Sequence, residues 1–138
     1  SHYEDVLVQR VHKWIDEETV KCRFGHINNF EHLLESTGTR VVKFYLHISH
    51  EEQLERLEER QTNPEKMWKH NDGDMKEREQ WDNYMQAYED VFEHCSKAAP
   101  WFVIPSDKNW YKEHLAAKHI RDILKKMDPQ FPPLQEGS

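Results

Sequence analysis

Basic side chains gather in the middle of the sequence, where they could bind an anion. Lys66 and Lys69 lie three residues apart, and Arg78 follows after a polar stretch. Residues three apart share a face on a helical turn, so the two lysine charges can point the same way. Lysine suits a repeating polyanion, whereas arginine can grip one phosphate with two parallel hydrogen bonds. The alternative is a solvated charge run, in which these cations pair with Asp72, Asp74, Glu77 and Glu79.

Two further arginines, Arg56 and Arg60, lie four residues apart on an expected helix. This spacing puts both side chains on one helix face. Acidic residues flank them at Glu55, Glu58 and Glu59. The competing interpretation is therefore a solvent-exposed helix surface laced with salt bridges.

The ten histidines do not form a recognisable metal site. His47 and His50 straddle the end of an expected strand, and His114 and His119 lie five apart, which is off one helix face. Neither pair has a carboxylate or cysteine at the spacing of a zinc ligand. The sequence therefore predicts no zinc site.

Composition narrows the class of protein. The 138 residues are enough for one domain with a core. Charged residues make up 33% of the chain, yet five tryptophans are present, and a disordered chain would be poor in aromatic residues. We expect a folded body with a charged exterior. The formal net charge of -7 argues against broad binding to nucleic acid or to an anionic membrane.

Three observations predict a cytoplasmic protein. The two cysteines, Cys22 and Cys95, lie far apart, which suggests no disulfide framework and fits a reducing compartment. No apolar run approaches the roughly 20 residues of a membrane span. No cleavable signal segment is visible either.

The first long helix and the first strand have clear boundaries in the sequence. Asp16 is a candidate N-cap, followed by Glu17 and Glu18, which favour the first turn of a helix. Apolar residues then recur at helical spacing until Gly38, a typical helix stop. The β-branched and aromatic run at residues 40–49 predicts a buried strand.

The next segment combines a helix, a polar turn and a second helix. Ser49 opens a capping box with Glu52, and the helix that follows is expected to end near Asn63-Pro64. Residues 64–74 are polar and contain a turn. Asp74 is the expected cap of the next helix, whose apolar stripe is clearly amphipathic. That stripe consists of Trp81, Tyr84, Met85, Tyr88, Val91, Phe92 and Cys95.

The last part of the chain predicts a strand, a helix and a tail. Residues 101–105, WFVIP, form a second candidate for a buried strand, and apolar residues from Trp110 to Met127 indicate a final helix. Ser106-Asp107 follows the strand at the edge where open α/β sheets bind ligands, although capping the last helix is the alternative. Residues 128–138 contain three prolines and predict a flexible tail.

The order of elements predicts an α/β fold with a parallel sheet covered by helices. Two strands alone make a poor sheet, so we expect further strands upstream of Ser1. None of the four glycines lies in a GxxxxGK[ST] phosphate loop.

Trp68, Trp81 and Tyr84 are candidates for stacking on a nucleotide base. The competing interpretation is that they form an apolar seam between helices.

Several long motifs occur in an order that resembles the polyphosphate kinase 2 family. They cover roughly residues 1–125. In chain order they are SHYEDVL, GHINNFEHLL, KFYLHIS, NPEKMWK, EQWDNYMQAYE and APWFVIPSDKNWY. Within the family, the chain is most similar to the branch that carries SHYED, some members of which act on nucleoside monophosphates as well as diphosphates.

The resemblance implies a P-loop kinase fold, with three α/β/α layers and a helical lid at about residues 62–82. Residues 1–127 would be the C-terminal part of that domain, lacking the upstream strands and the phosphate loop. Family members move a phosphoryl group between polyphosphate and a nucleotide with Mg²⁺. The implied partners are polyphosphate, AMP, ADP or ATP, and further copies of the chain in a homo-oligomer.

The resemblance also assigns roles to single residues. Asp5 would lie beside the Walker B strand and help to place Mg²⁺ or the acceptor phosphate. The alternative is that Asp5 is a helix cap or a surface acid. Arg56 and Arg60 would act on the phosphate in transfer. The residues expected to bind the phosphates of polyphosphate or nucleotide are Lys66, Lys69, Arg78 and Arg10.

Two other functions remain open on the sequence. Without a phosphate loop, the chain could be a phosphate-binding or assembly module that performs no turnover. A P-loop nucleoside monophosphate kinase that uses ATP as donor is a third possibility, and it would be indifferent to polyphosphate.

Overall fold

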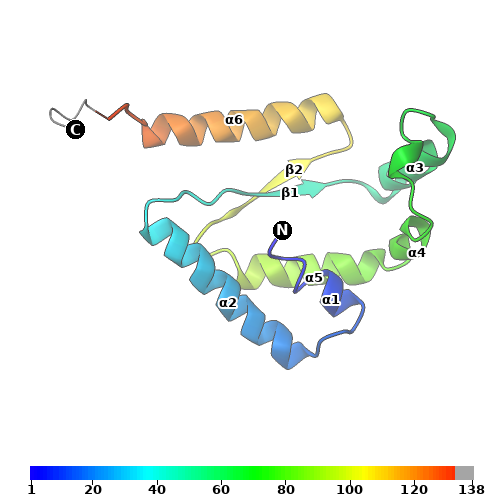
Figure 1. The fold of residues 1–138 in the computed structure, drawn as a ribbon, viewed down its shortest axis with the longest axis horizontal. Coiled ribbons are helices and arrows are strands. Elements are labelled where there is room, and N and C mark those ends of the chain that lie inside the picture. Colours follow the sequence, from blue (N-terminus) through cyan, green and yellow to red (C-terminus); the bar gives the residue numbers. More distant parts are fainter. Residues whose placement is uncertain (133–138) are drawn as a thin grey trace, which may run out of the picture.

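Helices lie on both sides of a small parallel sheet in the computed structural model, which describes residues 1–132 (Figure 1). Helix α6 lies on one side of the sheet, and α2 and α5 lie on the other. The α/β class predicted from the sequence is thereby confirmed. In chain order the elements are α1 (Val8–Val11), α2 (Glu17–Ser36), β1 (Lys43–His47), α3 (His50–Thr62), the 3₁₀ turn η1 (Met67–Lys69), α4 (Asp74–Arg78), α5 (Trp81–His94), β2 (Trp101–Pro105) and α6 (Asn109–Met127).

The two strands run parallel, as predicted, with Lys43 opposite Trp101 and His47 opposite Pro105. Parallel neighbours need a long crossover connection. Residues 48–100 supply it and include α3, α4 and α5. Both strands therefore end on the same side of the molecule, close to α3 and α4 (Figure 1).

The strands are less buried than the sequence predicted. The first strand covers residues 43–47 rather than 40–49. Leu46 is 51% exposed and Val103 is 57% exposed. The prediction of two buried strands is wrong at these positions, because within residues 1–132 the sheet has only two strands and the helices cover each face in part.

Aromatic side chains hold the helices to the sheet. On one face, the ring of Tyr45 lies 4.7 Å from that of Tyr88 and 5.1 Å from that of Phe92 on α5, measured between centroids. On the other face, the ring of Phe102 lies 4.5 Å from that of His119 on α6. The amphipathic stripe of α5 thus packs against β1 as its spacing indicates.

Most helix boundaries follow from capping. The Asp16 carboxylate accepts a hydrogen bond from the amide of Thr19, and the Ser49 hydroxyl accepts one from the amide of Glu52, as predicted. Gly38, two residues beyond the end of α2, has a φ of +90°, a conformation that glycine adopts without strain. Helix α3 ends at Thr62, just before Asn63-Pro64.

The predicted cap at Asp74 is wrong. Asp74 is the first residue of α4, Gly73 precedes it without a side-chain cap, and the Asp74 carboxylate accepts a hydrogen bond from Arg60 instead. The expected single helix is also divided, because α4 ends at Arg78 and α5 begins at Trp81. An ion pair therefore takes the place of the capping interaction.

The main apolar core lies between α1, α2 and α5, beside the sheet (Figure 1). Its fully or nearly fully buried members come from the N-terminal segment, from α2 and from α5. They are Tyr3, Val6, Leu7, Val20, Phe24, Ile27, Ala87, Val91 and Cys95. None of the helices within residues 1–132 combines the length and apolar character that a membrane span requires.

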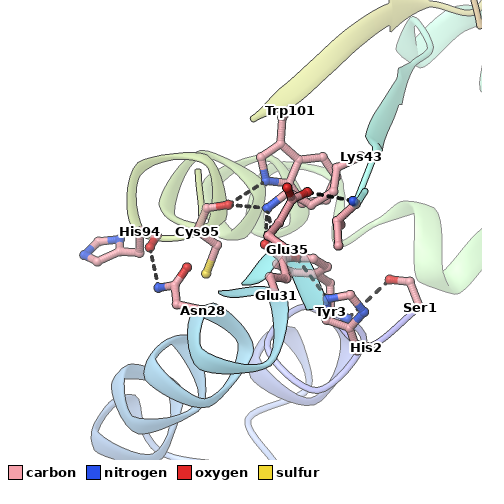
Figure 2. A network of polar contacts seen from close by, with 11 residues as sticks. Ser1, His2, Tyr3, Asn28, Glu31, Glu35, Lys43, His94, Cys95 and Trp101 are labelled. Atoms are coloured by element: carbon pink, nitrogen blue, oxygen red, sulfur yellow. Dashed lines mark hydrogen bonds and ion pairs between the residues drawn. The ribbon is translucent and has the colours of Figure 1, made fainter. Parts of the chain in front are cut away.

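A buried ion pair crosses this core and was not anticipated from the sequence. The Lys43 ammonium donates to the Glu31 carboxylate at 2.7 Å, to the Cys95 carbonyl at 2.6 Å and to the Tyr3 hydroxyl at 2.9 Å. The Tyr3 hydroxyl in turn donates to Glu31 at 2.6 Å. Figure 2 shows these side chains converging from the N-terminal segment, α2 and β1.

The network satisfies every donor of the lysine, which can give three hydrogen bonds. Both charges are almost wholly withdrawn from water, with Lys43 at 5% exposure and Glu31 at 0%. The indole of Trp101 also donates to the Cys95 carbonyl, at 3.1 Å. Burial, together with the Glu31 carboxylate, raises the pKa of Tyr3 well above its ordinary value, so this phenol remains protonated and can donate.

Removal of one partner from this network should be costly. We expect Lys43→Met to lower the free energy of unfolding by about 3–5 kcal/mol, because it leaves the Glu31 carboxylate buried without its cation. The double variant Lys43→Met/Glu31→Met should lose less than the single variant, since no unpaired charge then remains. Urea titration followed by circular dichroism measures both.

The matched control is Arg121→Met, which breaks the exposed pair that Arg121 forms with Asp122. Exposed pairs contribute little, so its unfolding midpoint should stay close to that of the parent chain. A Lys43→Met variant as stable as the Arg121→Met variant would contradict the role given to the buried pair.

The two thiols should differ sharply in reactivity. Cys22 is exposed, whereas Cys95 is buried, and burial raises the pKa of Cys95 to about 11. Because the thiolate is the reactive species, we expect one fast-reacting thiol per folded chain with Ellman's reagent near pH 8, and two after unfolding in urea. Cys22→Ser should remove the fast reaction; two fast thiols in the folded chain would contradict the buried position of Cys95.

Candidate functional site

Three arginines line one cleft at the end of the sheet where both strands finish. The cleft has a volume of about 470 Å³ and lies between β1, α3, α4 and α5. We call it the arginine cleft. It brings together Arg56, Arg60 and Arg78, three of the cations selected from the sequence. Its other polar and aromatic lining residues are Tyr45, Gln53, Asp74, Glu77, Trp81, Tyr84 and Tyr88.

Arg56 is fixed in place by hydrogen bonds at the end of β2. Its guanidinium donates to the carbonyls of Ser106 and Asp107, at 2.8 and 3.1 Å, and to the Glu52 carboxylate at 2.8 Å. It therefore ties α3 to the loop that follows β2. An arginine held this way offers a rigid charge to the cleft, because most of its donors already have partners.

Asp107 completes this junction and does not cap α6. Its carboxylate accepts a hydrogen bond from the amide of Ser49 at 2.8 Å, and this contact is the main reason why the pKa of Asp107 lies below its ordinary value. The residue before α6, Lys108, makes no side-chain cap. Asp107 thus joins the two loops that follow the strands.

Arg60 and Arg78 keep more of their donors available than Arg56 does. Arg78 donates through Nη1 to the His50 carbonyl at 2.8 Å and to Gln53 at 2.9 Å. Arg60 donates through Nη1 to the Asp74 carboxylate at 3.0 Å. Within residues 1–132, no hydrogen bond uses Nε or Nη2 of either side chain. Both arginines can therefore make further hydrogen bonds to an anion in the cleft.

Glu77 is the second acid of the cleft, and it binds neither arginine. Its carboxylate accepts a hydrogen bond from the Tyr84 hydroxyl and lies 2.9 Å from Nε2 of His12. The hydrogen bond from Tyr84 is the main reason why the pKa of Glu77 is lowered. Burial, followed by this same contact, raises the pKa of Tyr84. No local pattern links Glu77 to His12, because 65 residues separate them in the sequence.

The two lysines lie beyond the cleft, around η1. Lys66 donates to the Glu59 carboxylate at 2.6 Å, and the ammonium of Lys69 lies 4.9 Å from the centre of the Trp68 ring. A second hollow of about 450 Å³ lies beside η1, and its lining includes Arg60, Met67 and His70 but neither lysine. Arg60 lines both hollows and therefore lies between the arginine cleft and the hollow beside η1.

Trp68 does not belong to an apolar seam. Its side chain is 77% exposed, which makes the seam interpretation wrong for this residue. Trp81 and Tyr84 are only partly exposed and do line the cleft between helices.

Asp5 and Arg10 lie outside the arginine cleft. The Asp5 carboxylate is exposed, accepts a hydrogen bond from Gln9 at 2.7 Å and lies 3.9 Å from a guanidinium nitrogen of Arg23. Arg10 donates to Glu17 and to Asp90, at 2.6–2.9 Å, and these contacts, chiefly that with Glu17, raise its pKa. The structure shows a pairing role for Arg10, and phosphate binding by Arg10 stays a prediction.

A complete metal site is not formed by protein side chains alone. In the part of the chain that the structure describes, no three histidine, cysteine or carboxylate side chains converge as a metal would require. Magnesium, however, is commonly held by one or two carboxylates together with phosphate oxygens and water. The exposed Asp5 carboxylate fits that kind of shared coordination.

Comparison with known proteins identifies relatives over nearly the whole chain. The family model described as Polyphosphate kinase 2 matches residues 1–132. The chain is 44% identical to the AMP/ADP-polyphosphate phosphotransferase of Meiothermus ruber, covering 100% of this chain and 52% of that protein. It is 36% identical to the ADP-polyphosphate phosphotransferase of Rhodopseudomonas palustris, covering 96% of this chain and 50% of that protein. The chain thus spans about half the length of these curated relatives.

Solved structures agree with this assignment. The crystal structure of polyphosphate kinase 2 from Arthrobacter aurescens TC1 superimposes with a TM-score of 0.92 at 41% identity, covering 99% of this chain and 48% of that one. A polyphosphate kinase 2 structure from Pseudomonas aeruginosa gives a TM-score of 0.86 at 29% identity, covering 96% of this chain and 28% of that one.

The structure separates fixed cations from available ones, and stability measurements can test this. We expect Arg56→Lys to lower the free energy of unfolding by about 1–3 kcal/mol. A lysine ammonium cannot reproduce the planar guanidinium, which donates to the Glu52 carboxylate and to the Ser106 and Asp107 carbonyls together. Lys66→Ala should leave the unfolding midpoint unchanged within error, since its ion pair is exposed. Equal stability of both variants would contradict the structural role of Arg56.

Proposed function

The chain belongs to the polyphosphate kinase 2 family, and we propose that it forms part of an Mg²⁺-dependent enzyme. This enzyme would transfer a phosphoryl group between inorganic polyphosphate and a nucleoside mono- or diphosphate. The names of its relatives, AMP/ADP-polyphosphate and ADP-polyphosphate phosphotransferase, support this substrate pair.

The observation that carries the proposal is the arginine cleft. Phosphoryl transfer asks the protein mainly to position phosphates and to neutralise the charge that moves between them. Arg60 and Arg78 retain donors for this task, and Arg56 adds a fixed positive charge. The cleft lies at the ends of parallel strands, which is where open α/β sheets bind their ligands.

The proposed mechanism is an in-line attack. A terminal oxygen of the nucleotide would attack the end phosphorus of polyphosphate, and the shortened polyphosphate would leave with the electrons of the broken P–O bond. Arg60 and Arg78 would donate hydrogen bonds to the phosphate in transfer. Asp5 would share in holding Mg²⁺, which supplies positive charge next to the phosphate oxygens when bound.

Residues 62–82 would act as the lid of this site. They include η1 and α4, and four of them, Met67, His70, Asp72 and Met75, line the hollow next to the arginine cleft. Lys66 and Lys69 carry flexible charges at exposed positions, which suits a polymer that slides through different registers. Binding of polyphosphate would require Lys66 to exchange Glu59 for a phosphate oxygen, a small change because exposed ion pairs are weak.

Other features of the proposal rest on the family alone. We propose a cytoplasmic enzyme that assembles as a homo-oligomer, with residues 1–127 as part of one P-loop kinase domain. The phosphate-cradling loop would come from the portion of the full-length enzyme that these residues do not include.

The test is formation of ATP from ADP, long-chain polyphosphate and Mg²⁺ by the enzyme that contains these residues. We expect Lys66→Ala/Lys69→Ala to reduce kcat/KM for polyphosphate by at least about tenfold, because two charge-assisted contacts are lost. The KM for ADP should change much less.

Two results would contradict the proposal. An enzyme that makes ATP only when another nucleoside triphosphate is supplied would be an ordinary nucleotide kinase. Polyphosphate that binds without being consumed would indicate the non-catalytic binding module.

The matched control for the lysine variant is Lys125→Ala/Lys126→Ala at the end of α6, a pair of exposed lysines remote from the cleft.

A further inference from the structure

Three side chains from separate elements meet at one edge of the arginine cleft. The Glu77 carboxylate of α4 accepts a hydrogen bond from the Tyr84 hydroxyl of α5, and the same oxygen lies 2.9 Å from Nε2 of His12, directly after α1. We call this group the Glu77 clasp. Glu77 and Tyr84 line the cleft, whereas His12 is not one of its lining residues.

The position of helix α4 depends on its contacts with other elements. It has five residues, and no side chain caps its start. A helix this short is unstable in isolation, so its place depends on tertiary contacts. Gly73 precedes it and Glu79-Gln80 separates it from α5. The side-chain contacts of α4 therefore decide where its charged residues lie.

These contacts point to two different parts of the molecule. Two residues of α4 bind α3. Asp74 accepts a hydrogen bond from Arg60, and Arg78 donates to the His50 carbonyl and to the Gln53 side chain. Glu77 instead binds residues outside α3, at the end of α1 and on α5. The Glu77 clasp therefore links the lid side of the cleft to the core of the domain.

The clasp also controls the charge inside the cleft. A free carboxylate beside Arg60 and Arg78 would compete with phosphate for their donors. Oε1 of Glu77 contacts both the Tyr84 hydroxyl and Nε2 of His12, and within residues 1–132 the carboxylate forms no ion pair with an arginine. The Arg78 donors that face the cleft are thereby left for an anion.

The end of α1 is shaped to present His12. Lys13 has a φ of 57°, which turns the chain sharply after His12. The ring of His12 stacks on that of Trp14, with centroids 4.9 Å apart and planes 20° apart. This stacking restrains the imidazole and directs it toward α4.

We propose that His12, Glu77 and Tyr84 are positioning residues, which hold α4 in place and keep Glu77 away from the cleft arginines. Their effect on phosphate binding acts through Arg60 and Arg78. This inference rests on the proposed function for its consequence, but the structural part, the anchoring of α4, can be measured independently.

The experiment compares Glu77→Gln, Tyr84→Phe, His12→Ala and His12→Gln with the parent chain. Glu113→Gln is the control, because Glu113 is exposed on α6. One readout is amide hydrogen exchange in residues 74–80. The second is the Kd for tripolyphosphate with Mg²⁺, followed by tryptophan fluorescence. Thermal unfolding reports whether any variant loses the global fold.

We expect Tyr84→Phe and His12→Ala to speed exchange in residues 74–80 and to weaken tripolyphosphate binding about three- to tenfold, a change of the size that one typical hydrogen bond contributes. The midpoint temperature of thermal unfolding should change little. His12→Gln should restore both readouts in large part, because the glutamine amide can donate from nearly the same place as Nε2. Glu77→Gln should show the fast exchange, and Glu113→Gln should match the parent.

Two outcomes would overturn the inference. Unchanged exchange in residues 74–80 of Tyr84→Phe and His12→Ala would show that the clasp does not hold α4. Fast exchange with unchanged tripolyphosphate affinity would show that α4 does not position the arginines. A parent chain that does not bind tripolyphosphate would count against the proposed function instead, and the exchange data would then decide the anchoring alone.

Discussion

The buried ion pair between Lys43 and Glu31 is the interaction on which the other arrangements depend. Two charges removed from water are tolerated only when nearly all of their hydrogen bonds are satisfied. Here Tyr3, the Cys95 carbonyl and the ring of His2, whose Nε2 lies 3.1 Å from Glu31, provide the remaining contacts. The N-terminal segment, α2, the start of β1 and the end of α5 are therefore fixed to one another at a single point. Lys43 is the first residue of β1, and the arginine cleft opens at the other end of the same strand.

The charged residues of the chain divide into two kinds. Arg56 and Arg10 are held by several protein partners, and their first role is to join elements. Arg60, Arg78 and the two lysines keep donors or flexible stems that an anion can use. Sequence spacing alone cannot make this distinction, because both kinds lie among the same acidic neighbours. The distinction depends on which backbone carbonyls and carboxylates the fold places next to each cation.

Local features could be predicted from the sequence, and contacts between distant residues could not. Caps at Asp16 and Ser49, the glycine stop after α2 and the parallel strands all follow from short-range patterns. Asp74 was misassigned as a cap because Arg60, fourteen residues earlier, competes for its carboxylate. Lys43 looked like an ordinary strand residue, since nothing in its neighbourhood reveals that Glu31 and Tyr3 meet it.

In the candidate site, too, single residues could be predicted from the sequence, whereas their long-range contacts could not. Arg56, Arg60 and Arg78 could be selected as cations, and the fold brings all three to one cleft. Glu77 and His12 carry no local signal, because their contact depends on how α4 packs against the end of α1. The exposure of Trp68 also departs from the expectation for an aromatic residue, since η1 contains no buried residue.

The proposal that phosphate binds in the arginine cleft can be tested on the chain itself. Its most direct test is an amide NMR titration of the chain with Mg²⁺ and tripolyphosphate, with arginine side-chain resonances included. If phosphate binds in the cleft, the largest shifts should fall on α4, the end of α3 and the side chains of Arg60 and Arg78. Saturable shifts confined to α6 or to α2, with the cleft unaffected, would contradict it.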